Sequence, residues 1–377
     1  MNYVMLKDVC AINMGQSPDS KSYNDTGDGV PFFQGNADFG ARYPVTRKWC
    51  SEPTKMAAPN DILISVRAPI GAMNYARENC CIGRGLAALT PDKSKALPEF
   101  IFWLLKGKNA ELNSKGTGST FKAISRKVLE EIMIPEISLE KQIEFSEILE
   151  RVYGVIQARK EELQKLDELI KARFVELFGD PRSNPFGFEK KMLKDTCKVI
   201  TGNTPSRAIA EYYGDYIEWI KTDNIVSGIL NPTQATESLS EKGMNVGRTV
   251  EKDSILMACI AGSIASIGRV CITDRTVAFN QQINAVVPEQ YNILFLYVLF
   301  QMSKDYLVED INMALKGILS KSKLEEKEFI IPPMDLQEQF SDFVKQVDKS
   351  KFDTMTFAPI YAIINLYLHT YFYQGRR

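Results

Sequence analysis

The segment LKDVC at residues 6–10 returns almost unchanged as LKDTC at residues 193–197. The resemblance continues downstream, since MGQSP at residues 14–18 is matched by TGNTP at residues 201–205, again 187 positions later. Two matches at one spacing indicate an internal duplication. The sequence therefore predicts two domains of one fold within this chain.

The repeat persists along both halves, with a spacing that grows as loops gain residues. DILIS at residues 61–65 resembles DSILM at residues 253–257, and both predict a short strand entered through an acidic turn. RGLAALTP at residues 84–91 resembles QQINAVVP at residues 281–288, and each predicts a strand stopped by proline. Further matches follow in the same order: two apolar runs typical of buried helices (100–105 and 295–300), two serines with a leucine four residues on (Ser125 with Leu129, Ser320 with Leu324), the closing pairs Ile134-Pro135 and Ile331-Pro332, and residues 139–143 with 336–340.

Between the two copies lies a segment with the apolar spacing of a coiled coil. From Phe145 to Leu177 the seam advances in alternating steps of four and three, interrupted only by Arg159 and Arg173. A Gly-Pro exit at residues 178–181 predicts the end of the helix, whose roughly 36 residues would span about 54 Å and act as a spacer. The predicted seam contains Leu149, Val152, Ile156, Leu163, Leu166, Ile170 and Leu177, and after the second copy it resumes with Leu336, Phe340, Phe343 and Val347.

These patterns predict an α+β protein in which two similar α/β domains are separated by long helices. We expect the domains at residues 1–135 and 190–335, the central helix at 136–180 and the start of a second helix at 336–351. Residues 352–377 form an atypical tail, in which Pro359 would break a continuing helix and an aromatic run lacks heptads. The second helix is therefore predicted to be shorter than the central one, which leaves the central seam beyond about Ile156 without part of its partner.

Composition indicates an ordinary folded chain of 377 residues, with 45% hydrophobic and 25% charged residues and a net charge of −1. Seven cysteines without a C-x-x-C pair, and the single histidine His369, offer no ligand set for structural zinc, so free buried cysteines are expected. The first residues lack the features of a signal peptide, which predicts a reducing cytoplasm. The tail is too short and irregular to predict a membrane span.

Catalytic motifs are poorly represented. There is no phosphate-binding G-x-x-x-x-G-K-[ST] loop, and GTGST at residues 116–120 lacks the third glycine of a dinucleotide site. Asn184-Pro185-Phe186 resembles the N-P-P-Y/F motif of amino-methyltransferases without its second proline, and a plain turn is favoured there. One histidine cannot supply convincing Ser-His or Cys-His machinery. The chain is predicted not to be an enzyme by itself and to hold no cofactor or metal.

Binding residues are better represented. Residues 104–127 hold lysines, an arginine and small hydroxyls against the single acid Glu111, which suits DNA phosphates, although a solvated loop remains an alternative. The phosphate-binding candidates are Lys115, Thr117, Ser119, Thr120 and Lys122, with Lys316, Ser320 and Lys321 in the second copy. Amide and guanidinium groups are the usual readers of base edges, and the candidates are Gln34, Asn36, Arg67 and Arg84 in the first copy and Lys221, Asn224, Arg269, Gln281 and Gln282 in the second. Each could equally be a turn or surface residue, but where the copies differ they would read different bases.

Over about residues 1–350 the chain resembles the specificity subunits of type I DNA restriction–modification systems. The resemblance rests on the two L-K-D-x-C…G-x-[ST]-P openings and on GSTFKAIS at residues 118–125 before a closing Ile-Pro. Its most specific part is the segment from LEKQIEFSEILERV to LFGDP at residues 139–181. The chain is therefore similar to a family whose members direct other subunits to DNA.

The resemblance implies two target recognition domains, each reading half of a split site in double-stranded DNA. It implies two helices packed as an antiparallel coiled coil that fixes the gap between the half-sites. Methyltransferase subunits would bind S-adenosylmethionine, and motor subunits using ATP would join for restriction, so no cofactor is expected on this chain. Two other hypotheses remain at this stage: a coiled-coil assembly protein or inactive truncated subunit without DNA-directed activity, and a self-sufficient methyltransferase.

Overall fold

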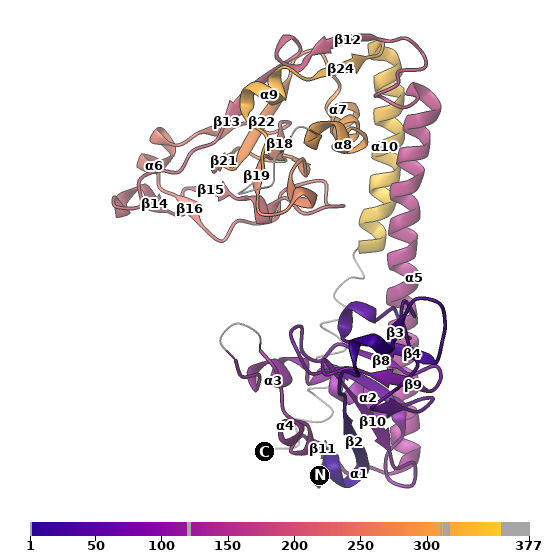
Figure 1. Cartoon of the computed structure of the whole chain (residues 1–377). Helices are drawn as coiled ribbons and strands as arrows, with labels where there is room; N and C mark the ends of the chain where they lie inside the picture. The colour runs from indigo at the N-terminus through magenta and orange to yellow at the C-terminus, as the bar shows by residue number, and fades with distance from the viewer. Residues whose placement is uncertain (1, 119–121, 310, 312–316, 356–377) are drawn as a thin grey trace. The chain divides into compact units, whose positions relative to one another are not determined.

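The computed structural model describes residues 2–118, 122–309, 311 and 317–355 (Figure 1). The described chain divides into two compact units, and the boundary between them falls between Arg159 and Lys160. Each unit contains small β-sheets and short helices, and long helices connect and flank them, so the predicted α+β class is confirmed. Most of the predicted atypical tail, residues 356–377, lies outside the described residues.

The described part of the first unit combines three sheets with short helices. The sheets are β1 (Tyr3–Met5) with β11 (Met133–Pro135); β2 (Cys10–Met14), β10 (Leu86–Pro91), β7 (Ile62–Ser65) and β8 (Met73–Tyr75) in that order; and β3 (Tyr23–Asn24), β5 (Trp49–Cys50), β4 (Val30–Phe33), β9 (Cys80–Ile82) and β6 (Met56–Ala57) in that order. The helices are α1 (Leu6–Val9), α2 (Pro98–Gly107), α3 (Asn109–Ser114) and α4 (Arg126–Glu130).

The second unit repeats this plan strand for strand. Its sheets are β12 (Glu189–Met192) with β24 (Glu328–Ile331); β13 (Cys197–Thr201), β22 (Ile283–Pro288), β18 (Ile255–Ala258) and β20 (Val270–Ile272); and β14 (Tyr213–Gly214), β16 (Ser238–Leu239), β15 (Ile217–Ile220), β21 (Val277–Phe279) and β17 (Thr249–Val250). A further pair joins β19 (Ile260–Ala261) to β23 (Gly317–Ile318), and the helices are α6 (Glu241–Val246), α7 (Ile293–Met302), α8 (Lys304–Val308) and α9 (Lys321–Glu325). The predicted duplication is confirmed.

The repeated LKD motif anchors the start of each domain to its end. Leu6 and Leu193 are fully buried, and the Leu6 N–H donates to the Ile132 carbonyl at 2.8 Å. The Leu193 N–H makes the matching bond to the Lys327 carbonyl at 2.9 Å. Because both bonds join residues far apart in sequence, the motif closes each domain on itself.

The repeated glycine of MGQSP and TGNTP lies against the backbone at the end of a strand. A Cβ atom on Gly15 would stand 2.2 Å from the Gly83 carbonyl oxygen, and one on Gly202 would stand 2.1 Å from the Asn280 oxygen. Both distances are far below van der Waals contact, so neither position has room for a side chain. The glycine recurs because the close approach recurs.

The strand register corrects one part of the sequence alignment. Ile62 pairs with Leu89 and Ile255 pairs with Val286, so β7 and β18 match at a spacing of 193 residues rather than 192. Asp253 is therefore equivalent to Asn60, and both have a positive φ, at 64° and 72°. Asn and Asp tolerate this conformation better than other side chains, which explains the turn on physical grounds.

Each domain is followed by a long helix that packs on it in the same way. Helix α5 (Leu139–Phe178) presents Gln142, whose side-chain oxygen accepts from the Leu97 N–H at 2.8 Å. Helix α10 (Met334–Met355) presents Gln337, which accepts from the Asn292 N–H at 3.0 Å. These two glutamines, rather than the residues paired from sequence, are equivalent, so the helices match at a spacing of 195. Gly179, at a φ of 70°, ends α5 where the sequence predicts.

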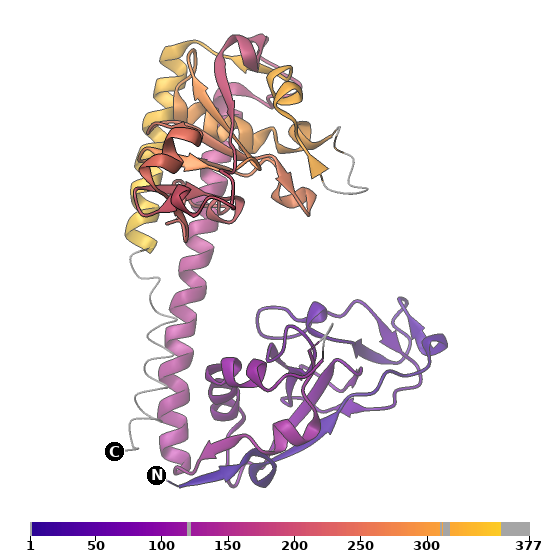
Figure 2. The ribbon, with the colours of Figure 1, turned by 90° about the vertical axis from the view of Figure 1, so that its left-hand side faces the viewer.

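The C-terminal part of α5 packs against α10 in the second unit, where both helices lie side by side (Figures 1 and 2). The Phe178 ring lies 5.5 Å from the Phe340 ring, and Lys351 forms an ion pair with Asp167. Since residue numbers rise on one helix as they fall on the other, the pair is antiparallel. Its buried positions include Phe174 and Phe178, each one residue beyond the predicted seam positions Arg173 and Leu177.

The remaining predicted seam residues divide between the two units. Leu149 and Ile156 are buried in the core of the first unit, with Val152 packed against it. In the second unit Ile170, Phe340 and Val347 are buried, and Leu166, Leu177, Leu336 and Phe343 pack against that core, whereas Leu163 is half-buried. The central helix thus packs against both domains, with its first part in the first unit and its last part in the second. The expectation that the seam beyond about Ile156 would lack part of its partner is wrong, because α10 is antiparallel to α5 and its first residues cover the end of α5.

Two smaller predictions concern cysteines and the segment after α5. All seven cysteines are free and buried, as predicted, and burial raises the pKa of the Cys10 and Cys197 thiols to about 12. Asn184 forms a turn, since its side chain bonds the Phe188 backbone N–H and carbonyl at 3.0 and 2.8 Å. The plain turn favoured over a methyltransferase motif is therefore confirmed.

Candidate nucleic-acid interface

In the first unit the candidate base readers gather where two parallel strands end. Strands β4 and β9 run parallel, with Phe33 beside Ile82, so the chain leaves both strands at the same edge. Gln34 and Arg84 follow at that edge, and both are exposed. The Gly85 N–H donates to the Gln34 carbonyl at 3.1 Å, which fixes the two loops against each other.

Further candidates join this edge through backbone hydrogen bonds. The Val66 N–H donates to the Gly85 carbonyl at 2.9 Å, which brings Arg67 beside the edge. The Ala68 N–H donates to the Lys122 carbonyl at 3.1 Å, and Thr117 bridges to Ala123. Arg67, Thr117 and Lys122 are exposed, whereas Ser119 and Thr120 lie outside the described residues. The structure thus connects the candidate base readers with the candidate phosphate contacts.

The loop that carries Asn36 is held by one carboxylate. Asp38 accepts hydrogen bonds from the Gln34 N–H at 2.7 Å and from the Gly35 N–H at 3.4 Å. Asn36 begins the 3₁₀ turn that these bonds close, and its side chain is half-buried. The loop is therefore shaped before any ligand arrives.

Several lysines of the basic segment 104–127 have partners within the first domain. Glu111 lies 2.8 Å from both Lys108 and Lys115. Burial raises the pKa of Glu111, but the hydrogen bonds from the two lysines outweigh it and leave that pKa below its usual range. Lys106 lies over the rings of Trp103 and Tyr153. Of the two lysines of this segment predicted to contact phosphate, Lys115 is thus held by an acid, whereas Lys122 is exposed beside the first edge.

The second unit builds the same edge from β15 and β21. These strands are parallel, with Ile220 beside Phe279, and the Asn280 N–H donates to the Ile220 carbonyl at 3.0 Å. Lys221 and Gln281 follow the two strands as Gln34 and Arg84 do in the first unit. The Gln281 side-chain oxygen accepts a hydrogen bond from Thr204.

The other candidates of the second copy have mainly internal partners. Asn224 is 7% exposed, and its amide group donates to Thr233 and Gln234, so it closes a loop. Arg269 donates to the Thr222 carbonyl at 3.2 Å. The Gln282 side-chain oxygen accepts from Asn280 at 3.1 Å, and the Ser320 hydroxyl accepts from the Lys323 N–H at 3.3 Å. Lys321 forms an ion pair with Glu325 at 3.5 Å. Lys316 lies outside the described residues.

Sequence reasoning missed two residues at the second edge, Arg207 and Glu237. Glu237 forms ion pairs with Arg207, at 2.6 Å, and with Lys221. The hydrogen bonds from Lys221 and then from Arg207 hold the pKa of Glu237 below its usual range. No motif marks these positions, and only the strand order brings residues 207, 221 and 237 together.

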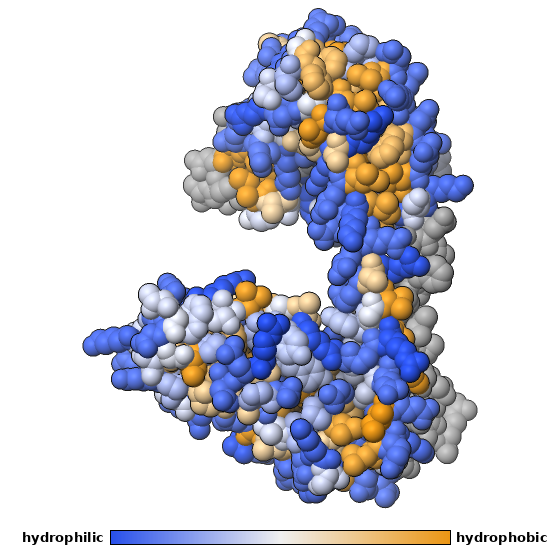
Figure 3. All heavy atoms as spheres, turned by 90° about the vertical axis from the view of Figure 1, so that its right-hand side faces the viewer, coloured by the Kyte–Doolittle hydropathy of each residue, from blue (hydrophilic) through white to orange (hydrophobic). Residues whose placement is uncertain are grey.

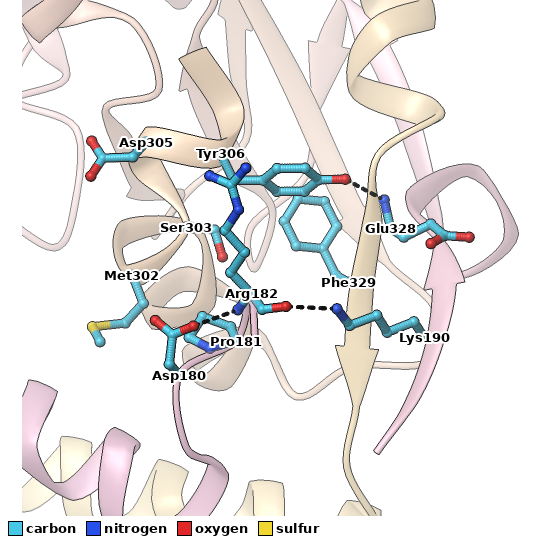
Figure 4. A pocket seen from close by; sticks show the side chains of 10 residues that line it. All are labelled: Asp180, Pro181, Arg182, Lys190, Met302, Ser303, Asp305, Tyr306, Glu328 and Phe329. Atoms are coloured by element: carbon cyan, nitrogen blue, oxygen red, sulfur yellow. Dashed lines mark hydrogen bonds between the residues drawn. The ribbon is translucent and has the colours of Figure 1, made fainter. Parts of the chain in front are cut away.

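A surface pocket of the second unit lies elsewhere, beside the exit of α5 (Figure 4). It has a volume of about 240 Å³, and its polar residues carry both charges, among them Asp180, Arg182 and Lys190. Lys190 donates to the Arg182 carbonyl at 2.9 Å. None of the candidate DNA-binding residues that the structure describes lines this pocket, so it is not part of the candidate interface.

Helix α5 also has exposed apolar side chains that neither unit covers. Ile143, Val155, Leu169 and Val175 are 46–50% exposed. Figure 3 shows apolar patches broken by hydrophilic side chains on one face of the molecule. None of the described helices combines the length and apolar character needed to cross a bilayer.

Known proteins resemble the chain along most of its length. A model of the family described as "type I restriction modification DNA specificity domain" matches residues 1–168 and again residues 185–360. The MjaIX specificity subunit of a type I restriction enzyme from Methanocaldococcus jannaschii is 25% identical over 375 residues, which covers 90% of this chain and 85% of that protein. The putative MjaX specificity subunit from the same organism is 42% identical over 157 residues, covering 42% of this chain and 37% of that protein.

The fold also has counterparts among solved structures. The crystal structure of the S subunit of a type I restriction–modification system from M. genitalium matches 97% of this chain and 94% of its own, with a TM-score of 0.58 and 14% sequence identity. A second structure, from work on the structural basis of complex assembly and conformational transition of the type I restriction–modification system, has a TM-score of 0.51 and 17% identity. The match covers 97% of this chain and 96% of that chain. At these identities the likeness concerns the fold.

Proposed function

The chain belongs to the type I restriction–modification DNA specificity family, and from this premise we propose that it selects the DNA sequence for such a complex. It is the non-catalytic subunit. It reads a bipartite target in double-stranded DNA, and each domain recognises one half. Residues 1–135 and 190–335 act as target recognition domains, the helices at 136–180 and from 336 to 351 set the distance between half-sites, and residues 352–377 have no assigned role.

The observation that carries this proposal is the edge that each domain repeats. Parallel strands present Gln34 and Arg84 in one domain and Lys221 and Gln281 in the other, on backbones with matching hydrogen bonds. Amide, guanidinium and ammonium groups on a rigid edge suit hydrogen bonding to bases. Because the scaffold is common and the side chains differ, the two domains read different half-sites.

Phosphate contacts come from the exposed polar residues beside the first edge. Lys122 and Thr117 lie on backbone segments bonded to the reading loops, so they fix the register of the domain on the duplex. In the second domain the proposed contacts are Ser320, which caps α9, and Lys321, which begins it; Ser125 and Arg126 hold the same two positions at α4 in the first domain. Because the chain has a near-neutral net charge of −1, part of the contacts to DNA phosphates would come from partner subunits.

Methyltransferase subunits are the proposed partners of the helices. The half-exposed apolar side chains of α5 supply surface that a partner helix would bury. Those subunits bind S-adenosylmethionine, and motor subunits that use ATP join for restriction. This chain contributes recognition and spacing.

The test is the genome-wide adenine methylation pattern in a host that expresses this chain with its neighbouring methyltransferase subunit. A two-part, asymmetric motif with a fixed gap is expected. A palindromic motif would mean that two chains each contribute one domain. No methylation, with both proteins soluble and associated, would contradict the proposed function and leave an assembly protein or an inactive subunit.

A further inference from the structure

The second domain carries a cluster of Arg207, Lys221 and Glu237 that has no counterpart among the described residues of the first domain. The Trp219 N–H donates to the Glu237 carbonyl at 3.1 Å, as the Phe32 N–H donates to the Lys48 carbonyl at 2.9 Å. Lys48 therefore occupies in the first domain the position of Glu237 in the second. One edge has a cation where the other has a carboxylate.

Two aromatic rings hold the cluster in place. The Arg207 guanidinium lies 4.4 Å from the Tyr213 ring centre and 5.1 Å from that of Trp219, and the Lys221 ammonium also lies 5.1 Å from Trp219. Trp219 is buried, and Tyr213 donates through its hydroxyl to the Pro205 carbonyl at 2.6 Å. The charged groups thus rest on a fixed base, which a reading site requires.

The cluster remains accessible. The side chains of Arg207, Lys221 and Glu237 are 55%, 27% and 36% exposed. Lys221 follows β15, the strand that pairs in parallel with the strand before Gln281, so the cluster belongs to the same edge. It presents donors on two side chains and an acceptor on the third.

A carboxylate at a DNA-facing edge needs a specific explanation, because it repels phosphates and lowers general affinity. In the major groove the only hydrogen-bond donors on base edges are the exocyclic amino groups of cytosine and adenine. A carboxylate accepts from them, whereas lysine and arginine select acceptors. An edge with all three groups therefore distinguishes base pairs that a purely cationic edge would confuse.

We propose that Glu237 reads a base of the second half-site by accepting a hydrogen bond from an exocyclic amino group, cytosine N4 or adenine N6. Lys221 and Arg207 hold the carboxylate in position and donate to acceptors beside that group. This inference rests on the proposed function, and it assigns to residue 237 one position of the target.

The experiment compares Glu237→Leu with Glu218→Leu in the full chain bound to its methyltransferase subunit. Glu218 precedes Trp219 on the same strand and so faces the opposite side, where it pairs with Arg275 at 2.7 Å. Binding is measured on duplexes that carry the wild-type motif with one base pair replaced at a time. For Glu237→Leu, which has no acceptor, discrimination at one base pair of the second half-site should fall about tenfold or more, and Glu218→Leu should retain it.

The replaced base pair identifies the source of the amino group. Relaxed preference at a cytosine indicates N4, and at an adenine it indicates N6. Glu237→Asp keeps the charge on a shorter side chain and should lose discrimination at the same position. A uniform gain in affinity with a steeper salt dependence would overturn the inference, because Glu237 would then only neutralise the two cations. If the wild-type protein gives no motif, the proposed function fails instead.

Discussion

The two domains differ most where they are otherwise most alike, at the edges formed by their parallel strands. The first edge presents Gln34 and Arg84, with Lys48 beside them, and the second presents Lys221 and Gln281 with Glu237. Equivalent backbone bonds shape the two edges, such as the Gly83 N–H to the Phe33 carbonyl at 2.8 Å and the Asn280 N–H to the Ile220 carbonyl at 3.0 Å.

Under the proposed function, the residues that build the fold and the residues that read DNA are therefore different residues. Buried leucines, glycines and strand pairs are repeated because the backbone needs them, and they contact one another within each domain. The residues that follow the parallel strands do not pack in the core, so their side chains can differ between the two domains without destabilising the core. Substitutions in the repeated set should affect one domain's stability, and substitutions in the varied set should affect one half-site.

The largest expected effect comes from the phenylalanine that joins each long helix to its own domain. Phe340 lies 5.6 Å from the Phe174 ring and 6.4 Å from the Phe295 ring, and Phe145 lies 5.8 Å from the Phe100 ring. Phe340→Ala should lower the free energy of unfolding of the second unit by about 3–5 kcal/mol, and Phe145→Ala that of the first.

Hydrogen exchange followed by mass spectrometry checks this prediction unit by unit, because a two-domain chain need not unfold in one step. Each variant should lose amide protection in its own unit and keep it in the other. Equal loss in both units for either variant would show that the domains do not have independent cores.

A smaller, equally domain-specific effect is expected from the repeated glycines. A Cβ atom at Gly15 or Gly202 would overlap a carbonyl oxygen, so the backbone at the strand end must shift. Gly15→Ala should destabilise the first domain by about 1–3 kcal/mol and Gly202→Ala the second. Thermal unfolding measures the change, with Gly262→Ala as control, because Gly262 lies outside helices and strands and a Cβ there meets no atom within 4 Å. An unchanged midpoint for both strand-end variants would contradict the close approach.

The repeated features are the ones that could be predicted from the sequence. LKD, the strand-ending prolines, the apolar helices and the serine caps recur because local packing demands particular residues. The end of α5 was equally predictable, since Phe178 is followed by a glycine at positive φ. The seam was predicted less well near its end, where steps of four from Ile170 to Phe174 and Phe178 replace the heptad pattern. There α5 meets the aromatic side chains of a domain core as well as α10.

What the sequence did not provide is the pairing of distant strands. Nothing in residues 30–33 or 80–82 indicates that they run parallel and end together, so Gln34 and Arg84 were candidates without a shared site. The same pairing in the second domain brings Glu237 to Lys221. The structure also shows that the amide group of Asn224, a candidate base reader in the sequence, forms hydrogen bonds within its own loop.

The first edge can be made to resemble the second by one substitution. Arg84→Gln places at the first edge the amide that Gln281 supplies at the second. Loss of the guanidinium should relax the preference at one base pair of the first half-site by about 1–3 kcal/mol and leave the second half-site unchanged. The methylation motif and competition binding measure this. Arg77→Gln is the control, because Arg77 precedes β9 and lies over the Tyr43 ring, whereas Arg84 follows the other end of that strand. A change in the second half-site would contradict the separation of the two readers.

The smallest expected effect is on the salt dependence of DNA binding, and it should differ between Lys122 and Lys115. Lys122 is exposed beside the first edge, whereas Lys115 is held by Glu111 at 2.8 Å. Lys122→Ala should weaken binding to all DNA sequences alike and reduce the slope of log affinity against log salt by about 0.9, the value for one lost phosphate contact. Lys115→Ala should change the slope less, because its ammonium already has a carboxylate partner. Salt titrations of both variants against the wild-type complex test this, and equal slopes for Lys122→Ala and wild type would remove Lys122 from the interface.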